Sequence, residues 1–202
     1  MGQVEQAIAA IRAGRPVILP TDTVYGLCAS PYREEPVARL YRLKGRPETI
    51  PTALFCSDID MLFECVPELR GRSGLYARAI LPGPYTLIFP NPARRFGWLN
   101  GLARDTIGIR VPVLQGDSRQ VLDRVGALTA TSANRHRGID PKRLEDVPAE
   151  IREACGAEID GGELPGVPST VLDLTGPEPR VVREGAAPGA EALERLAAVI
   201  AA

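Results

Sequence analysis

The sequence contains almost no histidine, and this scarcity restricts the chemistry that the chain can perform. Among its 202 residues, His136 is the only histidine. A Ser-His-Asp triad or a multi-histidine metal site would have to be built around that one side chain. His136 stands in the polar stretch Asn-Arg-His-Arg-Gly, which is typical of a solvated loop. Catalytic triads and histidine-rich metal centres are therefore disfavoured.

Paired cysteines and glycine-rich phosphate loops are missing as well. No two cysteines have Cys-x-x-Cys spacing, which argues against a zinc site or a dithiol redox site. The sequence also lacks a Gly-x-x-x-x-Gly-Lys-Ser/Thr loop and a Gly-x-Gly-x-x-Gly motif, so any nucleotide must be held by another arrangement. We expect reduced core thiols at all four cysteine positions, which are Cys28, Cys56, Cys65 and Cys155.

Long hydrophobic runs and an excess of one charge are also absent. No apolar run approaches membrane-spanning length, and the first residues lack the basic start and apolar block of a signal peptide. We therefore expect a cytoplasmic protein. The net charge is −1 and aromatic residues make up 5%, which argues against a broad electrostatic nucleic-acid binder. With 45% apolar and 24% charged residues, the chain fits one ordinary globular domain.

Helical and strand patterns intermix along the whole chain. Apolar residues at helical spacing predict helices over residues 4–11, 35–44, 59–65, 67–81, 116–125, 149–154 and 190–200. Short apolar runs predict strands at 17–19, 25–29, 52–56, 85–89, 106–111, 127–130, 170–174 and 180–183. This mixture predicts an α/β fold with one large mixed sheet. The polar segments 91–105 and 135–148 are expected to be loops, the second of them mobile.

Polar side chains follow several of the apolar segments directly. The run 17–19 stops at Pro20, which cannot donate to a sheet ladder, and Thr21-Asp22-Thr23 comes next. Taken singly, such groups are explained as turn formers or as cations at a helix end. Taken together, hydroxyls, an amide and several cations at strand ends predict a concave polar site for a polyanion. The other three groups are Lys44-Gly45-Arg46, Ser132-Ala133-Asn134, and Pro168-Ser169-Thr170 with Arg183.

Short motifs in a fixed order resemble the YrdC/TsaC family over nearly the whole chain. The pieces Lys-x-Arg and Ser-x-Asn are weak alone, but the ordered set is highly specific. The resemblance implies that residues 1–202 form a single YrdC-like domain, with a twisted open mixed β-sheet, flanking helices and a concave polar cavity. The motifs are Pro20–Leu27, Lys44–Pro47, Gly83–Leu87, Gly108–Pro112, Ser132–Asn134, Pro168–Val171 and Arg183–Ala186.

The resemblance implies an L-threonylcarbamoyladenylate synthase, which is a nucleotidyltransferase. The family makes this adenylate from L-threonine, bicarbonate and ATP, releases pyrophosphate, and thereby serves the threonylcarbamoyl modification of adenosine in tRNA. Mg²⁺ is expected to accompany ATP, coordinated largely by phosphates and water, with no metal site on the protein itself. The chain ends one helix after Arg183–Ala186 and looks like the short form of the family. That form depends on partner proteins for the transfer to tRNA, while direct tRNA binding stays open.

The resemblance also assigns roles to residues of this chain. Lys44 and Arg46 face the phosphates and are the expected catalytic pair. The threonine substrate is expected to contact Thr21, Arg110, Ser132 and Ser169. The nucleotide is expected to contact Lys44, Arg46, Thr106, Asn134 and Arg183. Cations suit phosphates and a carboxylate, and an asparagine amide can both donate and accept, so the residue types fit these roles independently.

Several positions depart from the family pattern. Ile50 stands where the family often has asparagine, and Phe55 where it often has histidine, so two polar contacts are lost. These changes bear on affinity and substrate choice more than on the reaction class. The loop after Asn134 adds the cations of residues 135–137 to the usual pattern, and we favour a solvated role for them over nucleotide binding. Asp22 is either an outer-shell partner of Mg²⁺ or a structural cap.

Three other readings compete. The first is an RNA-binding module without catalytic activity, which the net charge and the scarcity of aromatics disfavour. The second is a carbamoyl-AMP-forming relative, but those proteins are usually parts of larger chains with cysteine pairs that this chain lacks. The third is a paralogue that keeps the fold and has lost threonine, and Phe55 is the residue that keeps this reading open.

Overall fold

One mixed β-sheet organises the protein. The structure, a computed structural model, describes residues 2–201. Within that range nine strands pair in the order β7-β1-β2-β6-β3-β5-β4-β8-β9. The strands are β1 (Val17–Pro20), β2 (Tyr25–Ala29), β3 (Ala53–Cys56), β4 (Tyr85–Pro90), β5 (Thr106–Arg110), β6 (Ala127–Ser132), β7 (Ala157–Glu158), β8 (Thr170–Asp173) and β9 (Arg180–Arg183).

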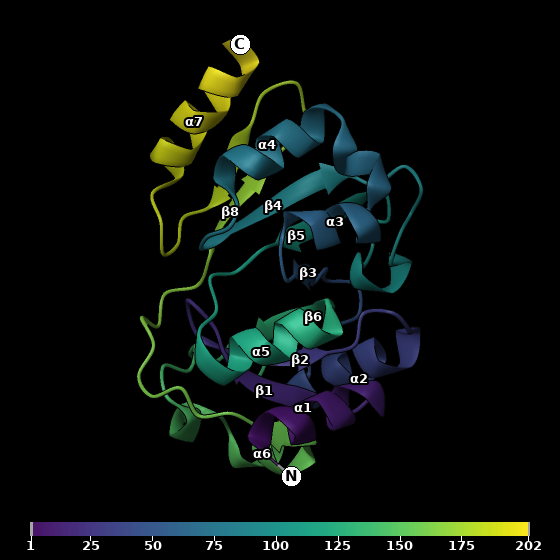
Figure 1. The fold of residues 1–202 in the computed structure, drawn as a ribbon, viewed down its shortest axis with the longest axis vertical. Coiled ribbons are helices and arrows are strands. Elements are labelled where there is room, and N and C mark those ends of the chain that lie inside the picture. The colour runs from purple at the N-terminus through teal and green to yellow at the C-terminus, as the bar shows by residue number, and fades with distance from the viewer. Residues whose placement is uncertain (1, 202) are drawn as a thin grey trace.

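Helices lie on both sides of this sheet (Figure 1). The α-helices are α1 (Gln3–Arg12), α2 (Glu34–Lys44), α3 (Ile59–Cys65), α4 (Arg72–Ile80), α5 (Gly116–Val125), α6 (Ala149–Ala154) and α7 (Gly189–Ala201). Short 3₁₀ helices are η1 (Pro67–Arg70), η2 (Gly97–Leu99) and η3 (Leu144–Asp146). The pairs β1–β7, β3–β5 and β4–β8 are parallel, and the other neighbouring strands pair antiparallel. The predicted α/β fold with one large mixed sheet is therefore confirmed.

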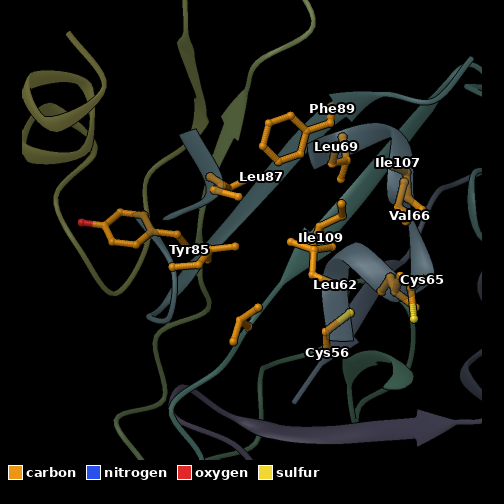
Figure 2. Packing of buried hydrophobic residues seen from close by; sticks show 14 of the residues in the cluster. Cys56, Leu62, Cys65, Val66, Leu69, Tyr85, Leu87, Phe89, Ile107 and Ile109 are labelled. Carbon is orange, nitrogen blue, oxygen red and sulfur yellow. The ribbon is translucent and has the colours of Figure 1, made fainter. Parts of the chain in front are cut away.

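Strand β5 shows how the sheet separates the core from the opposite face. Successive side chains of a strand point to opposite faces, so Ile107 and Ile109 share one face and Gly108 and Arg110 the other. Ile107 and Ile109 are fully buried in a cluster that α3, α4 and α7 complete. Figure 2 shows part of this cluster, in which Leu62 of α3 lies near Ile109 and Phe89 lies near Leu69. The face of β5 that carries Ile107 and Ile109 is thus part of the hydrophobic core.

The remaining helices cover the β1–β2–β6 part of the sheet. Helices α1 and α5 pack on the face that carries Leu19 and Cys28, while α2 and α6 pack on the face that carries Ile18 and Leu27. The face under α1 and α5 continues across β3, β5, β4 and β8. There the helices leave the face uncovered, and it borders a cavity. The gap between the covering helices therefore sets the position of the site.

Most predicted elements are confirmed within a residue or two, and three details differ. The predicted helix 67–81 is two elements, η1 and α4, because Gly71 (φ −78°, ψ −137°) lies outside the helical region. Strand β7 was missed, since two residues cannot show an alternating pattern and it forms by pairing with β1. The expected loops 91–105 and 135–148 contain the short helices η2 and η3, respectively. All four cysteines are buried and free, as expected.

The segment 135–148 is anchored at several points. The amide N–H of His136 donates to the Lys44 carbonyl (2.9 Å), and the Pro141 carbonyl accepts from Tyr25 N–H (3.0 Å). Leu144 and Val147 are buried in the core. The mobility of this segment stays a prediction. No helix within residues 2–201 combines the length and apolarity needed to cross a membrane.

Candidate active site

The cavity occupies the uncovered sheet face and has a volume of about 380 Å³. It is hollow because this face carries small side chains where the strands cross it, at Gly26, Ala53, Gly108 and Ala130. Every second residue of β3, β4, β5 and β8 points into the cavity. Larger polar residues stand at its walls. The polar and charged lining residues are Thr21, Thr23, Arg46, Thr52, Thr86, Thr106, Arg110, Thr131, Ser132, Asp140, Ser169 and Arg183.

The turn between β1 and β2 forms one wall. The Thr21 hydroxyl donates to the Val24 carbonyl (2.7 Å) and accepts from the Thr23 amide (3.2 Å). It also lies 3.0 Å from the Thr23 hydroxyl. Thr21 therefore closes the turn and lines the cavity at once, so the structural and the functional readings of this motif are compatible.

Arg110 is a buried cation at the floor of the cavity. Its side chain is 5% exposed and donates to Asp22 and to the Thr23 hydroxyl (3.1 Å). Its Nε–H is buried and has no partner within residues 2–201. The Phe55 ring lies under the guanidinium, with its centroid 5.1 Å from Cζ. Burial lowers the pKa of Arg110, but an arginine keeps its charge, and the free donor points to an anionic ligand.

This arrangement bears on two expectations, the role of Asp22 and the effect of Phe55. The Asp22 carboxylate accepts from both Arg110 and the Val113 amide (3.1 Å), so it acts as a structural counter-charge for Arg110. The structure thus favours the capping reading of Asp22 over an outer-shell role at Mg²⁺. Phe55 replaces the polar side chain that is frequent in the family, and it provides a cation–π contact instead.

Lys44 and Asn134 lie behind the cavity wall. The Lys44 amine, 2% exposed as a residue, donates to the carbonyls of Ser132 (2.5 Å) and Asn134 (3.1 Å) and to the Asn134 side chain. The Asn134 amide in turn donates to the Gly138 carbonyl (2.7 Å) and to Asp140 (3.2 Å). Burial lowers the pKa of Lys44 to about 8. The polar groups of both residues are thus engaged inside the protein.

Arg46 and Arg183 stand at the walls of the cavity. Arg46 donates to the Pro51 carbonyl (2.7 Å), and its buried Nε–H lacks a partner within the described chain. Arg183 donates twice to the Ser169 carbonyl, at 2.6 and 3.2 Å. Burial lowers the pKa of both guanidinium groups, and each remains charged. With Arg110 they give the cavity three guanidinium groups.

Hydroxyl groups complete the lining at β4, β5 and β8. The Ser169 hydroxyl lies 2.8 Å from the Thr86 hydroxyl across the β4–β8 pair. The Thr106 hydroxyl donates to the Ala103 carbonyl (3.0 Å), and the Ser132 hydroxyl donates to Asn134 Oδ1 (2.8 Å). Each hydroxyl retains a lone pair or can re-orient, so it can still contact a ligand.

Seven of the nine residues assigned from the family resemblance therefore line one cavity. Lys44 and Asn134 do not line it, and their place depends on contacts between α2 and the end of β6 that no sequence pattern displays. The side chain of Ile50 is not part of the lining either, although its carbonyl accepts from the Tyr41 hydroxyl (2.8 Å).

The loop after Asn134 behaves partly as expected. Arg135 pairs with Glu150 in an exposed ion pair, and Arg137 is exposed. His136 is half-buried in this loop and does not line the cavity. The cations of this loop thus stay outside the cavity.

Asp140 is the residue that sequence reasoning missed. It is the one carboxylate among the lining residues of the described chain, and it lies near the charges of Lys44 and Arg183. Its only signal in the sequence is its position six residues after Asn134, inside a segment that looks like an ordinary polar loop. Within residues 2–201 no cluster of three or more His, Cys, Asp and Glu side chains could hold a metal ion.

The chemistry that this cavity supports is charge stabilisation. Three guanidinium groups and several hydroxyls suit a ligand with phosphates and a carboxylate. No imidazole or thiol lies among the described lining residues, and the charged and hydroxyl-bearing side chains present can position a ligand and stabilise its charge.

Known proteins resemble this chain in both sequence and fold. The family model Sua5_yciO_yrdC, described as telomere recombination, matches residues 9–185. A threonylcarbamoyl-AMP synthase of Halorhodospira halophila is 33% identical over 85% of this chain and 90% of its own length. The enzyme of that name from Pyrococcus abyssi is 31% identical over 98% of this chain and 57% of its own length.

Solved structures agree with these matches. The crystal structure of P. abyssi Sua5 complexed with L-threonine superposes with a TM-score of 0.85 at 31% identity, covering 95% of this chain and 56% of that one. The crystal structure of E. coli YciO gives a TM-score of 0.76 at 26% identity over 92% and 90% of the two chains. From its sequence motifs, its sheet topology and the match over residues 9–185, the chain belongs to the Sua5/YciO/YrdC family.

Proposed function

We propose that this chain is an L-threonylcarbamoyladenylate synthase, which joins threonine, bicarbonate and ATP and releases pyrophosphate. The observation that carries the proposal is the buried Arg110, whose unpaired donor points to an anionic group in a cavity with two further guanidinium groups. The relatives named threonylcarbamoyl-AMP synthase and the threonine-bound Sua5 structure supply the substrate class.

Threonine is proposed to bind at the floor of the cavity. Its carboxylate would take the free Arg110 donor, because a buried guanidinium gains most from a charged acceptor. The hydroxyl-bearing residues Thr21, Ser132 and Ser169 would contact the rest of the amino acid. Phe55 makes the floor beside Arg110 apolar, and an apolar surface suits the methyl group of threonine better than a charged side chain.

ATP is proposed to occupy the side with Arg46, Thr106 and Arg183. The two guanidinium groups would hold phosphate oxygens, and the buried Arg46 Nε–H has no partner within residues 2–201. Lys44 and Asn134 would support this side indirectly, since their bonds fix Ser132 and the start of the following loop. Direct contact of these two residues with the nucleotide stays a prediction, because their polar groups are engaged inside the protein.

The reaction would proceed without a covalent enzyme intermediate. The amine nitrogen of threonine attacks the carbon of bicarbonate, and loss of water leaves a carbamate. A carbamate oxygen then attacks the α-phosphorus of ATP while the bond to the pyrophosphate oxygen breaks. Arg46 and Arg183 neutralise the charge that builds on the phosphate oxygens, and positioning supplies much of the remaining rate.

Mg²⁺ would enter as part of the ATP substrate. Magnesium is commonly held by one or two carboxylates together with phosphates and water, and Asp140 is the one carboxylate that the described lining offers. The donor set therefore fits a metal carried by the nucleotide. Bound there, Mg²⁺ would neutralise phosphate charge.

The cellular setting follows from the proposed product. A threonylcarbamoyl adenylate is an activated intermediate, so we place the protein in the cytoplasm beside proteins that transfer the group to tRNA. Direct contact of this chain with tRNA stays open. We also keep the proposal that residues 1–202 act as one domain.

Pyrophosphate release tests the function. With ATP and Mg²⁺ present, release should require both L-threonine and bicarbonate, and Arg110→Met should abolish this threonine-dependent release. Arg124→Met, which removes an exposed cation paired with Glu5, is the matched control and should leave turnover unchanged. Pyrophosphate release that ignores threonine would contradict the proposal and favour the paralogue that has lost this substrate.

A further inference from the structure

Two loops far apart in sequence are fastened together beside the cavity. The Leu102 amide donates to the Thr49 carbonyl (3.1 Å), and the Thr52 amide donates to the Leu99 carbonyl (2.8 Å). We call this backbone contact between residues 49–52 and 99–102 the clip. Both of its sides continue into the cavity wall, one through Thr52 and the other through Ala103.

Gly101 makes the clip possible. Its backbone approaches Thr49 so closely that a Cβ atom would lie 2.2 Å from the Thr49 carbonyl oxygen and 2.6 Å from its carbon. Its φ of +56° is also a conformation that side chains other than glycine disfavour. Since the obstructing atoms are backbone, any side chain at position 101 must push residues 49–50 away.

The turn at residues 49–51, which lies against Gly101, contains the carbonyl group that orients Arg46. Within residues 2–201, one hydrogen bond fixes the Arg46 guanidinium, from Nη2 to the Pro51 carbonyl (2.7 Å). A second hydrogen bond holds the same turn in place, since the Tyr41 hydroxyl donates to the Ile50 carbonyl (2.8 Å). A displacement of residues 49–51 therefore moves the acceptor that orients Arg46, while Arg110 at the floor keeps its own partners.

We propose that Gly101 is a positioning residue for the phosphate side of the site, acting through Arg46. This inference rests on the proposed function, because it assigns Arg46 to the phosphates of ATP. The clip sets the direction of the Arg46 guanidinium, so the Nε–H that is buried without a partner within residues 2–201 is already aimed for a phosphate oxygen. Pre-orientation of this kind lowers the entropy lost on binding.

The test compares two glycine variants in the same loop. Gly101→Ala should raise the Kd of MgATP, measured by calorimetry, about tenfold or more, as expected when a charge-assisted hydrogen bond is misdirected. Gly97→Ala is the matched control, because a Cβ at that position meets nothing within 4 Å, and it should leave the Kd unchanged. The Kd of L-threonine should change less than about twofold in both variants, since Arg110 is not connected to the clip.

A double-mutant cycle separates positioning from general damage. In an Arg46→Ala background, the added Gly101→Ala change should alter the Kd of MgATP by less than about twofold, because the residue it positions is gone. A merely structural defect would weaken MgATP by the same factor in either background. Tyr41→Phe removes the second support of the turn without inserting an atom, so it should raise the Kd in the same direction and serves as the probe if Gly101→Ala folds poorly.

The outcomes also distinguish this inference from the function it rests on. If the wild-type chain binds neither MgATP nor threonine, the proposed function fails. If the wild type binds both, while Gly101→Ala and Tyr41→Phe bind MgATP as tightly as Gly97→Ala, the positioning role alone is overturned. Equal loss of threonine and MgATP affinity in Gly101→Ala would likewise overturn it.

Discussion

The buried pair of Arg110 and Asp22 gives the sharpest stability prediction. The two side chains are 5% and 11% exposed, and the Asp22 oxygens accept from Arg110 and from the Val113 amide (3.1 Å). The substitution Asp22→Asn removes the negative charge and turns an NH₂ group toward one of these two donors. The Arg110 charge then stays buried without its counter-charge.

The expected loss can be estimated from these contacts. Breaking a buried ion pair from one side costs about 3–5 kcal/mol, because the remaining charge keeps its desolvation penalty. We expect the lower end, about 3 kcal/mol, since Arg110 keeps its bond to the Thr23 hydroxyl and the ring of Phe55. In a chain of this size that loss corresponds to a melting temperature lower by roughly 6 to 12 °C.

Urea unfolding, followed by circular dichroism, measures this loss. The control is Glu5→Gln, which breaks the exposed pair with Arg124 and should leave the unfolding free energy nearly unchanged. Adding Arg110→Met to Asp22→Asn should recover part of the loss, because the unpaired charge is gone. The reasoning is refuted if Asp22→Asn is as stable as Glu5→Gln, or if the double variant is less stable than Asp22→Asn alone.

Three further predictions concern the cavity and its surroundings. Because burial lowers the pKa of Lys44 to about 8 from its ordinary 10.5, the folded protein releases this proton first and gains stability as pH rises between those values. The unfolding free energy of the wild type relative to Lys44→Met should therefore increase over that range, and a constant difference would contradict it. Gly108→Leu should abolish binding of MgATP and threonine in calorimetry and change the melting temperature little. A Cβ at this position meets no atom closer than 3.8 Å and points into the cavity, so the larger side chain would fill the site without disturbing the fold. Retained binding would place the site elsewhere. Phe55→Leu should lose about 1 kcal/mol of cation–π energy in urea unfolding, and an equal effect in the Arg110→Met background would exclude that cause.

The sequence predicts the fold well where a pattern is local. The alternation in 106–111 and the apolar run 17–19 specify strands, and the motif order specifies the family. Two-residue β7 has no such pattern, because it exists only through its pairing with β1. The break at Gly71 has a local signal, since residues 70–74 (Arg-Gly-Arg-Ser-Gly) interrupt the apolar spacing of 67–81.

The site is predictable as a set of residue types and less so as a set of contacts. The sequence places Lys44 and Asn134 at the ends of two elements, but only the meeting of α2 with β6 engages their polar groups with each other. Asp140 has no recognisable motif, and it joins the cavity because the segment after Asn134 folds back over it. Such contacts depend on tertiary packing, which local patterns do not encode.

The alternation along β5 has a consequence for how this protein can change. Core residues Ile107 and Ile109 and cavity residues Thr106, Gly108 and Arg110 occupy the same five-residue strand. Inserting or deleting one residue there would turn the guanidinium into the hydrophobic core and the isoleucines into the cavity. Length variation among relatives should therefore be confined to the loops, while substrate preference can drift through point changes on one face alone.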